Sequence, residues 1–423
     1  MLTDNTQEKY SILDLGFDNL LTKFSSLQDI DLITPEMINN FTSGLNTKML
    51  GAGELGGLIG SGHQVIAVAI SDNIQTAIEK VNNLGGGTVL LEGGIHKPNY
   101  NIVLYSNVAL VGQEGGSTII DFDNQAYQVQ CFGTDTYATG TISIADGGAT
   151  VTGVGTAWTT SMEGQSILLS GAWYLIATVG SATSITLDST FSGTFNISAD
   201  TYVIANYISR ADIINITLQN STVSTGTVYY RYSYNCFMTQ TNHLDSTRGF
   251  TVQDSSFPIV RDNNVLNCGT GAYWIQVGLL TYEDFGIIDS TTGDGMNMYK
   301  CSNYTFFNWV STNNVGNGVT LDSCNDCGIF DFTVNSNIGH GVEFINSNNI
   351  QILNATISNN TDGIKLTSTS DHNILIQMTL KNNTRYGINI AASTCDNNEL
   401  GNNSYQNNTL GSIQDLGIGT NIS

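Results

Sequence analysis

Charged residues are scarce in this 423-residue sequence: Asp, Glu, Lys and Arg make up only 12% of it, about half the usual share for soluble domains. The charges are also unbalanced, with 13 basic against 36 acidic residues and a formal net charge of −23. Binding to phosphates requires a basic face, so we do not expect a nucleic-acid partner. Unassisted binding of an acidic polysaccharide is disfavoured too. A neutral glycan, or an acidic one bridged by cations, fits this charge better.

Proline, paired cysteines and long apolar runs are scarce as well. Three prolines stand against 45 glycines, and Asn, Ser and Thr supply most polar groups, which suits rigid β-structure with tight turns. The seven cysteines show no disulfide framework, and Cys324 and Cys327 form a lone CxxC without the second pair of a structural zinc site. No run of about 18 apolar residues is present, and residues 1–9 lack the features of a signal peptide, so we expect neither membrane insertion nor secretory export.

Glycines recur at nearly constant spacing in the last third of the chain, 22 to 24 residues apart. They are Gly295, Gly318, Gly341, Gly363, Gly387 and Gly411. Each opens a short alternating strand, and an Asn-rich turn precedes nearly all of them. A fixed period of this length, built from strand and turn alone, predicts a β-solenoid. The residues one and three after each glycine should point inward, and those two after it outward, which would place Glu343 beside Lys365.

Four segments follow from the pattern along the chain: 1–62, 63–133, 134–206 and 207–423. Residues 1–62 contain helical spacing and a Gly-rich joint, and they either attach the chain to a particle or cap the solenoid. Residues 63–133 begin the solenoid with an amphipathic helix over 71–84, capped by Ser71 or Asp72. Residues 134–206 have five short alternating strands of their own, which predicts a small inserted β-barrel or sandwich. Its Trp158, Trp173 and Tyr174 form either a sugar platform or a small core.

A family resemblance covers about residues 65–133 and 207–423. The helix, followed by GGGTVLLEGGIHK and SNVALVGQEGGSTII, resembles the opening of right-handed parallel β-helix proteins of the pectate-lyase-like superfamily. The run ATVTGVGTAWTTSMEGQSILLSGAWYLIATVGSATSITL resembles a small β-module of phage structural proteins. The implied fold is all-β: a single-stranded parallel β-helix with an N-terminal capping helix and an inserted β-module.

The resemblance implies a viral structural protein of the phage tailspike or tail-fibre type. Such a protein would bind host-cell surface polysaccharide, contact other tail proteins through its N-terminal segment, form a homotrimer and reside in the extracellular virion. Two alternatives stay open. The chain is a polysaccharide lyase or glycoside hydrolase that acts on a bacterial or plant polysaccharide, or it is a purely structural solenoid of a particle or appendage.

The residues just before the glycines also align, and they give the candidate site if the chain is an enzyme. This pre-glycine column is Asp294, Asn317, His340, Asp362 and Tyr386. Glycoside hydrolysis needs two carboxylates about 5 to 9.5 Å apart. The candidate catalytic residues are Glu283, Asp289, Asp294 and His340, with Asp294 paired to Glu283 or Asp289. The candidate substrate-binding residues are Tyr273, Trp274, Asn297, Asn317 and Glu343. We expect no cofactor and no resident metal, with Ca²⁺ left open for a lyase.

Overall fold

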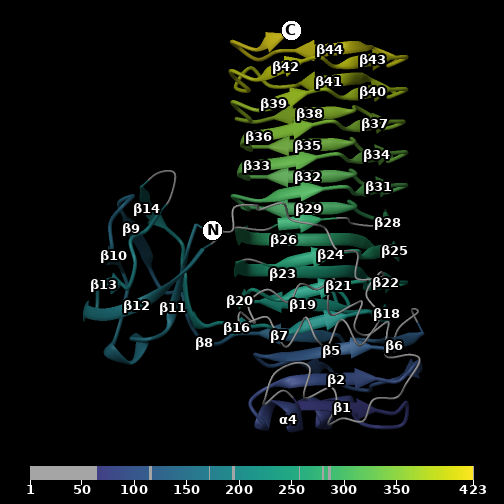
Figure 1. The fold of residues 1–423 in the computed structure, drawn as a ribbon. Helices are drawn as coiled ribbons and strands as arrows, with labels where there is room; N and C mark the ends of the chain where they lie inside the picture. The colour runs from purple at the N-terminus through teal and green to yellow at the C-terminus, as the bar shows by residue number, and fades with distance from the viewer. Residues whose placement is uncertain are drawn as a thin grey trace, which may run out of the picture.

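The computed structural model describes residues 64–422 except 114–116, 171, 193–195, 257, 279–280 and 284–286. The main body is a column of parallel strands in three long sheets, and each coil contributes one strand to each sheet (Figure 1). This arrangement confirms the β-solenoid predicted from the glycine period and the all-β right-handed parallel β-helix implied by the family resemblance. The prediction for residues 1–62 lies outside the described residues.

The strands of the three sheets follow one another in chain order. The first sheet contains β1 (Gln64–Val68), β2 (Gly87–Leu91), β5 (Val108–Gly112), β17 (Asp212–Ile214), β21 (Phe237–Thr239), β24 (Ile259–Arg261), β27 (Thr281–Glu283), β30 (Thr305–Phe307), β33 (Asn325–Phe330), β36 (Asn348–Leu353), β39 (Ile374–Ile376), β42 (Glu399–Gly401) and β45 (Asn421–Ile422). The second contains β4 (Ile102–Val103), β7 (Val129–Phe132), β19 (Val228–Arg231), β23 (Arg248–Ser256), β26 (Thr270–Gly278), β29 (Met296–Tyr299), β32 (Val319–Asp322), β35 (Val342–Ile345), β38 (Ile364–Thr367), β41 (Tyr386–Ile390) and β44 (Gly411–Asp415), with β16 (Ile208–Ser209) and β20 (Ser233–Tyr234) joined at its side. The third contains β3 (Gly94–His96), β6 (Thr118–Gln125), β18 (Thr217–Ser221), β22 (Asn242–Leu244), β25 (Asn264–Cys268), β28 (Ile287–Ser290), β31 (Val310–Thr312), β34 (Thr333–Asn335), β37 (Thr356–Ser358), β40 (Thr379–Lys381) and β43 (Ser404–Gln406).

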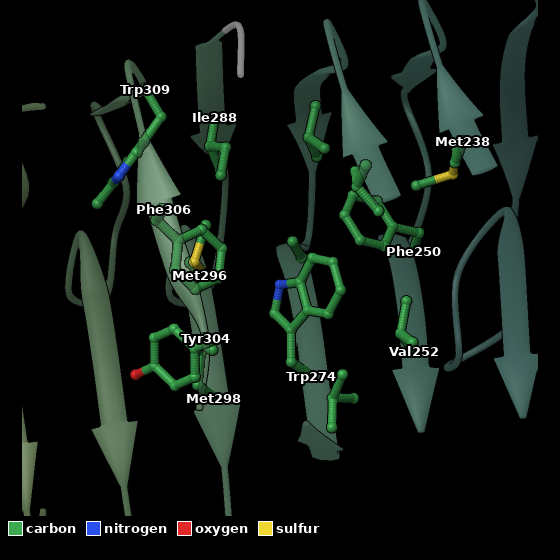
Figure 2. Packing of buried hydrophobic residues seen from close by; sticks show 14 of the residues in the cluster. Met238, Phe250, Val252, Trp274, Ile288, Met296, Met298, Tyr304, Phe306 and Trp309 are labelled. Atoms are coloured by element: carbon green, nitrogen blue, oxygen red, sulfur yellow. The ribbon is translucent and has the colours of Figure 1, made fainter. Parts of the chain in front are cut away.

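The core runs through the middle of the column, between the three sheets. The inward positions predicted after the first five of the six glycines are all at most 1% exposed. They are Met296, Met298, Val319, Leu321, Val342, Phe344, Ile364, Leu366, Ile388 and Ile390. Figure 2 shows such side chains on neighbouring coils, where Phe250 and Phe306 each pack edge to face against Trp274 in the interior.

Helix α4 (Ile74–Asn83) covers the N-terminal end of the column and buries Ile74 and Ile78 there. Its start differs from the prediction. Asn73 is the N-cap, and its side chain accepts the Thr76 N–H at 3.0 Å. Asp72 does not cap the helix because its carboxylate accepts the Ala69 N–H in the preceding turn. The helix ends at Asn83 with Leu84 as its C-cap, and the three glycines that follow, 85–87, all have positive φ.

A ladder of asparagines lies inside the column, at the turns before the glycines. Asn314, Asn337, Asn360 and Asn383 are at most 3% exposed. The side-chain oxygen of each accepts the backbone N–H of the ladder residue one coil earlier, at 3.0 Å from Asn337, Asn360 and Asn383. Asn408 continues the series by accepting the Asn383 N–H at 3.1 Å. The ladder supplies partners for buried backbone groups where no strand pairs with them.

This ladder gives a stability prediction. We expect Asn360→Ala to lower the free energy of unfolding by about 2 to 3 kcal/mol, because the buried N–H of Asn337 loses its acceptor. The matched control is Asn359→Gly, an exposed neighbour with φ +57 that glycine adopts freely, and it should change stability by less than about 0.5 kcal/mol. Urea denaturation measures both. Equal effects of the two substitutions would contradict the ladder's role.

The inserted segment forms one eight-stranded antiparallel sheet beside the column (Figure 1). Its strands, in spatial order, are β14 (Ile197–Asp200), β9 (Thr141–Ile144), β10 (Thr150–Val154), β13 (Ser184–Leu187), β12 (Ala172–Ser181), β11 (Ser166–Leu169), β15 (Val203–Asn206) and β8 (Thr134–Tyr137), with the 3₁₀ turn η3 (Thr160–Met162) between β10 and β11. Trp158 belongs to the core of this module and donates to the Tyr202 hydroxyl at 2.9 Å. Trp173 instead joins module and column, since its Nε1 donates to the Ser233 carbonyl at 3.2 Å.

Candidate functional site

The pre-glycine column is a hydrogen-bonded ladder on the edge of the second sheet. Asp294 Oδ1 accepts the Asn317 N–H at 2.8 Å, and Asn317 Oδ1 accepts the His340 N–H at 2.7 Å. His340 Nδ1 lies 3.3 Å from the Asp362 nitrogen, and Asp362 Oδ1 accepts the Tyr386 N–H at 3.1 Å. The side chains of Asp294, Asn317 and Asp362 therefore hold the backbone of the next coil. These hydrogen bonds explain why polar residues align in the column, and no catalytic role is needed to explain it.

Asp362 is the most enclosed carboxylate of this ladder, with a fully buried side chain. Its Oδ2 lies 3.2 Å from His340 Nδ1 and accepts from Asn389 Nδ2 at 3.0 Å, and its Oδ1 lies 3.6 Å from Arg385 Nε. Burial by itself raises the pKa of Asp362, but the hydrogen bonds from His340, Asn389 and the Tyr386 backbone outweigh burial and hold that pKa below its ordinary value. Asp362 is thus a fixed carboxylate and not a proton donor at neutral pH.

Four predicted site residues form two contacts on the outer face of the second sheet, Asn317 with Glu343 and Asn297 with Asp294. Asn317 Nδ2 donates to Glu343 Oε2 at 2.8 Å, and Lys365 Nζ lies 2.8 Å from Glu343 Oε1, which confirms the predicted neighbour pair. Asn297 Nδ2 is 3.4 Å from Asp294 Oδ2, a long contact. The short hydrogen bonds of Asn317 and Glu343 are therefore made within the protein and not to a ligand.

The three candidate carboxyl residues belong to different parts of the column. Glu283 ends β27 in the first sheet, Asp289 lies in β28 of the third sheet, and Asp294 precedes β29 of the second sheet. The strand positions thus do not place the proposed pairs on one sheet face. His340 is joined to Asp362 and belongs to the ladder described above.

The prediction that Trp274 contacts substrate is wrong. Trp274 is fully buried, and it aligns with Val252 and Met298 in the inward row of the second sheet. Its neighbour Tyr273 faces outward, half-buried beneath the Arg248 guanidinium at 4.7 Å from the ring centroid. Successive residues of a strand point to opposite faces, so two adjacent aromatic residues cannot share one binding surface.

The structure has a cleft between the inserted module and the column, which the sequence did not predict. It encloses about 760 Å³. One wall comes from module residues 168–170, 172, 174 and 200–203, and the other from coil residues that include Arg231, Tyr232, Asp254, Gln276 and Lys300. Ser302 Oγ donates to the Ser170 carbonyl at 3.2 Å and fixes the two walls to each other.

The coil wall of the cleft combines charged, amide and aromatic groups. Arg231 Nε lies 3.5 Å from Asp254 Oδ2, and its guanidinium lies over the Tyr232 ring at 4.6 Å. Burial raises the pKa of Asp254, which Arg231 and a hydrogen bond from Gln253 partly offset. Lys300 has no ion pair among the residues that the structure describes, and its ammonium lies 5.3 Å from the Tyr299 ring centroid. Such a surface suits a ligand rich in hydroxyl groups.

Within the described ranges, no group of three or more His, Cys, Asp or Glu residues is arranged to hold a metal ion. No described helix is long and apolar enough to cross a membrane.

A family model described as periplasmic copper-binding protein (NosD) matches residues 280–421, about a third of the chain. The described residues in that range do not fit a copper site. Their cysteines are buried, and burial raises the pKa of the Cys301 and Cys327 thiols well above the ordinary value, whereas metal binding requires thiolate. His340 is committed to Asp362.

A search of curated protein sequences finds no match. Among solved structures, the A-module of the mannuronan C-5 epimerase AlgE6 from Azotobacter vinelandii superposes with a TM-score of 0.54 at 15% identity, covering 83% of this chain and 94% of that one. The AlgE4 A-module from the same organism gives 0.50 at the same identity and coverage. The Pseudomonas phage phi297 tailspike gp61 gives 0.48 at 12% identity, covering 83% and 68%. The likeness at these identities is one of fold, and the chain is a right-handed parallel β-helix protein.

Proposed function

We propose that this protein binds polysaccharide in the cleft between the inserted module and the coils. The cleft itself is the observation that carries the proposal. Its volume of about 760 Å³ lies within the range of ligand sites, and it is lined by amide, hydroxyl and tyrosine side chains. A glycan segment offers hydroxyl groups to the amide and hydroxyl side chains, and it offers apolar ring faces to the tyrosines.

The charges in the cleft favour an uncharged glycan. Asp200, Asp254 and Asp326 outnumber the two cations that line the cleft, Arg231 and Lys300, and Arg231 is already paired. The whole chain is strongly acidic, which disfavours an acidic polymer further. The two epimerase modules of similar fold are named for mannuronan, a polysaccharide, which supports a polysaccharide ligand; because mannuronan is acidic, these modules do not support the choice of a neutral one.

In its finer form, the proposal is a phage tailspike or tail-fibre protein that adsorbs to host-cell surface polysaccharide. Residues 1–62 would then attach it to other virion proteins, and three copies would form the spike. Sedimentation equilibrium of the full chain tests the trimer, because three chain masses are expected. A monomer would count against the spike and leave glycan binding as a separate question.

A depolymerase is the second candidate, since Asp254 is a carboxyl group of raised pKa inside a cleft. It would act as the proton donor in glycoside cleavage. Release of reducing ends from a retained polysaccharide, abolished by Asp254→Asn, would favour the enzyme. Retention without release favours a binding protein.

The binding site itself is tested by filling the cleft. Ser323 lines it, whereas Ser368 occupies the equivalent corner two coils further on, outside it. Both have φ near +57, so a large residue strains the two backbones equally. We expect Ser323→Trp to weaken retention on purified bacterial capsular polysaccharides at least about 10-fold, because it occupies ligand volume. Ser368→Trp should leave retention unchanged. Equal retention by both variants would place the glycan elsewhere.

A further inference from the structure

One corner of the β-helix is formed by residues in the left-handed backbone conformation, one on each coil. We call it the cleft corner, and it lies at the ends of the second-sheet strands, inside β23 and β26 and directly after the others. The strand register aligns its members between β19 and β38. They are Tyr232, Asp254, Gln276, Lys300, Ser323, Asn346 and Ser368, with φ between +48° and +58°.

Side chains of most residue types are strained in this conformation, whereas Asn and Asp tolerate it best after glycine. At the corner that follows the first sheet, Asn and Asp fill six of the eight left-handed positions and Gln fills the other two. Its left-handed residues are Asn215, Gln240, Asp262, Asn308, Asp331, Asn354, Gln377 and Asn402. In the cleft corner, Asn and Asp fill only two of the seven positions. Tyr, Lys and Ser, which are absent from the first-sheet corner, occupy this conformation in the cleft corner.

The long side chains of the cleft corner are confined to the cleft. Tyr232, Gln276 and Lys300 all line it, whereas the two members beyond it, Asn346 and Ser368, are small. Asn or Asp would form this turn with less backbone strain. The strained residues in the cleft therefore point to a role in binding.

We propose that Tyr232, Gln276 and Lys300 are the residues that determine glycan specificity in the cleft, a proposal that rests on the function proposed above. They lie on the first, third and fourth coils of the cleft corner, so they extend over three coil steps, about 14 Å. They therefore contact successive sugar units. The Gln276 amide donates and accepts hydrogen bonds, and the Lys300 ammonium offers three donors to hydroxyl and ring oxygens. Tyr232 offers the ring face that the Arg231 guanidinium leaves open.

The test separates strain from binding by substituting asparagine. Gln276→Asn and Lys300→Asn keep the left-handed backbone at lower strain, so we expect each to raise Tm by about 1 °C. Both should lower the affinity for the retained capsular polysaccharide at least about 10-fold, because the shorter side chains no longer reach the ligand. Ser368→Asn is the control: it relieves the same strain outside the cleft, and it should raise Tm without any change in affinity.

Dextran and alginate serve as defined neutral and acidic probes beside the capsular panel. Binding that persists at wild-type strength in both cleft variants would overturn this inference while leaving the proposed function intact. A lower Tm in both would also overturn it, because the long side chains would then stabilise the corner. If the wild type retains none of the polysaccharides, the proposed function itself fails.

Discussion

Trp274→Ala is expected to lower the free energy of unfolding by about 4 kcal/mol. The indole is fully buried, and it packs edge to face against Phe250 on the preceding coil and Phe306, at centroid distances of 5.5 and 6.2 Å (Figure 2). Removing it leaves a cavity at the centre of the column, which the stacked strands cannot close by a local shift. Urea denaturation measures the loss.

The adjacent Tyr273→Ala is the control for this experiment. Tyr273 is half-buried on the outer face, and its loss should cost only about 1 kcal/mol. If Trp274→Ala does not fold, Trp274→Phe keeps most of the ring volume and should still lose about 1 to 2 kcal/mol. Weaker glycan retention by Trp274→Phe at unchanged stability would restore the binding role that the sequence suggested.

The second large effect is on the free energy of unfolding, which His243 and Asp212 make pH-dependent in opposite directions. His243 is fully buried, its Nε2 lies 2.9 Å from Thr241 Oγ1, and burial lowers the pKa of His243 to about 3. Burial raises the pKa of Asp212 to about 7, although the Phe237 N–H and Arg210 act in the opposite direction. Native His243 thus stays neutral and native Asp212 stays protonated across mildly acidic pH.

His243 and Asp212 make the free energy of unfolding depend on pH with opposite signs. Below pH 6.5 the unfolded chain protonates His243 and the native chain does not, so this contribution to stability is complete above pH 6.5 and is lost as pH falls toward 3. Above about pH 4 the unfolded chain ionises Asp212 and the native chain does not, so that contribution is complete below pH 4 and is lost as pH rises toward 7. Between pH 5 and 6.5, each contribution changes the free energy of unfolding by about 2 kcal/mol, and the two changes cancel.

Single variants should reveal each slope. Relative to wild type, Asp212→Asn should lose about 2 kcal/mol more at pH 5 than at pH 6.5, because only the His243 dependence remains. His243→Gln should show the reverse, with about 2 kcal/mol more lost at pH 6.5 than at pH 5. The double variant, measured by urea denaturation at both pH values, should regain the wild-type profile. Parallel profiles for all four proteins would rule out both assignments.

Sequence reasoning reached the β-helix because its signal is local and repeated. A glycine every 22 to 24 residues, followed by one alternating strand, fixes which side chains face the core, and Glu343 meets Lys365 simply because each occupies the same place in adjacent coils. It failed at Trp274, where two neighbouring aromatic residues were assigned to one surface although a strand alternates its faces. It also could not separate the Asn residues of the turns into the buried ladder at Asn360 and the exposed corner at Asn359, since both types read as turn signals.

The pre-glycine column shows the same limit in the candidate site. Alignment predicted that Asp294, Asn317 and His340 would lie together, and they do, but only the hydrogen bonds to successive backbones reveal that they hold coils in place. Spacing gives the position of a side chain along a solenoid. It does not give the partner that satisfies that side chain.

The period of the sequence by itself determined the stacked fold and its inward and outward rows, because every coil contacts only its neighbours. The cleft was decided by tertiary structure alone. Its walls meet at Ser170 and Ser302, which are 132 positions apart, and no repeat or local pattern relates the module to the coils. Which surface residues line the cleft therefore depended on where the inserted module lies against the column.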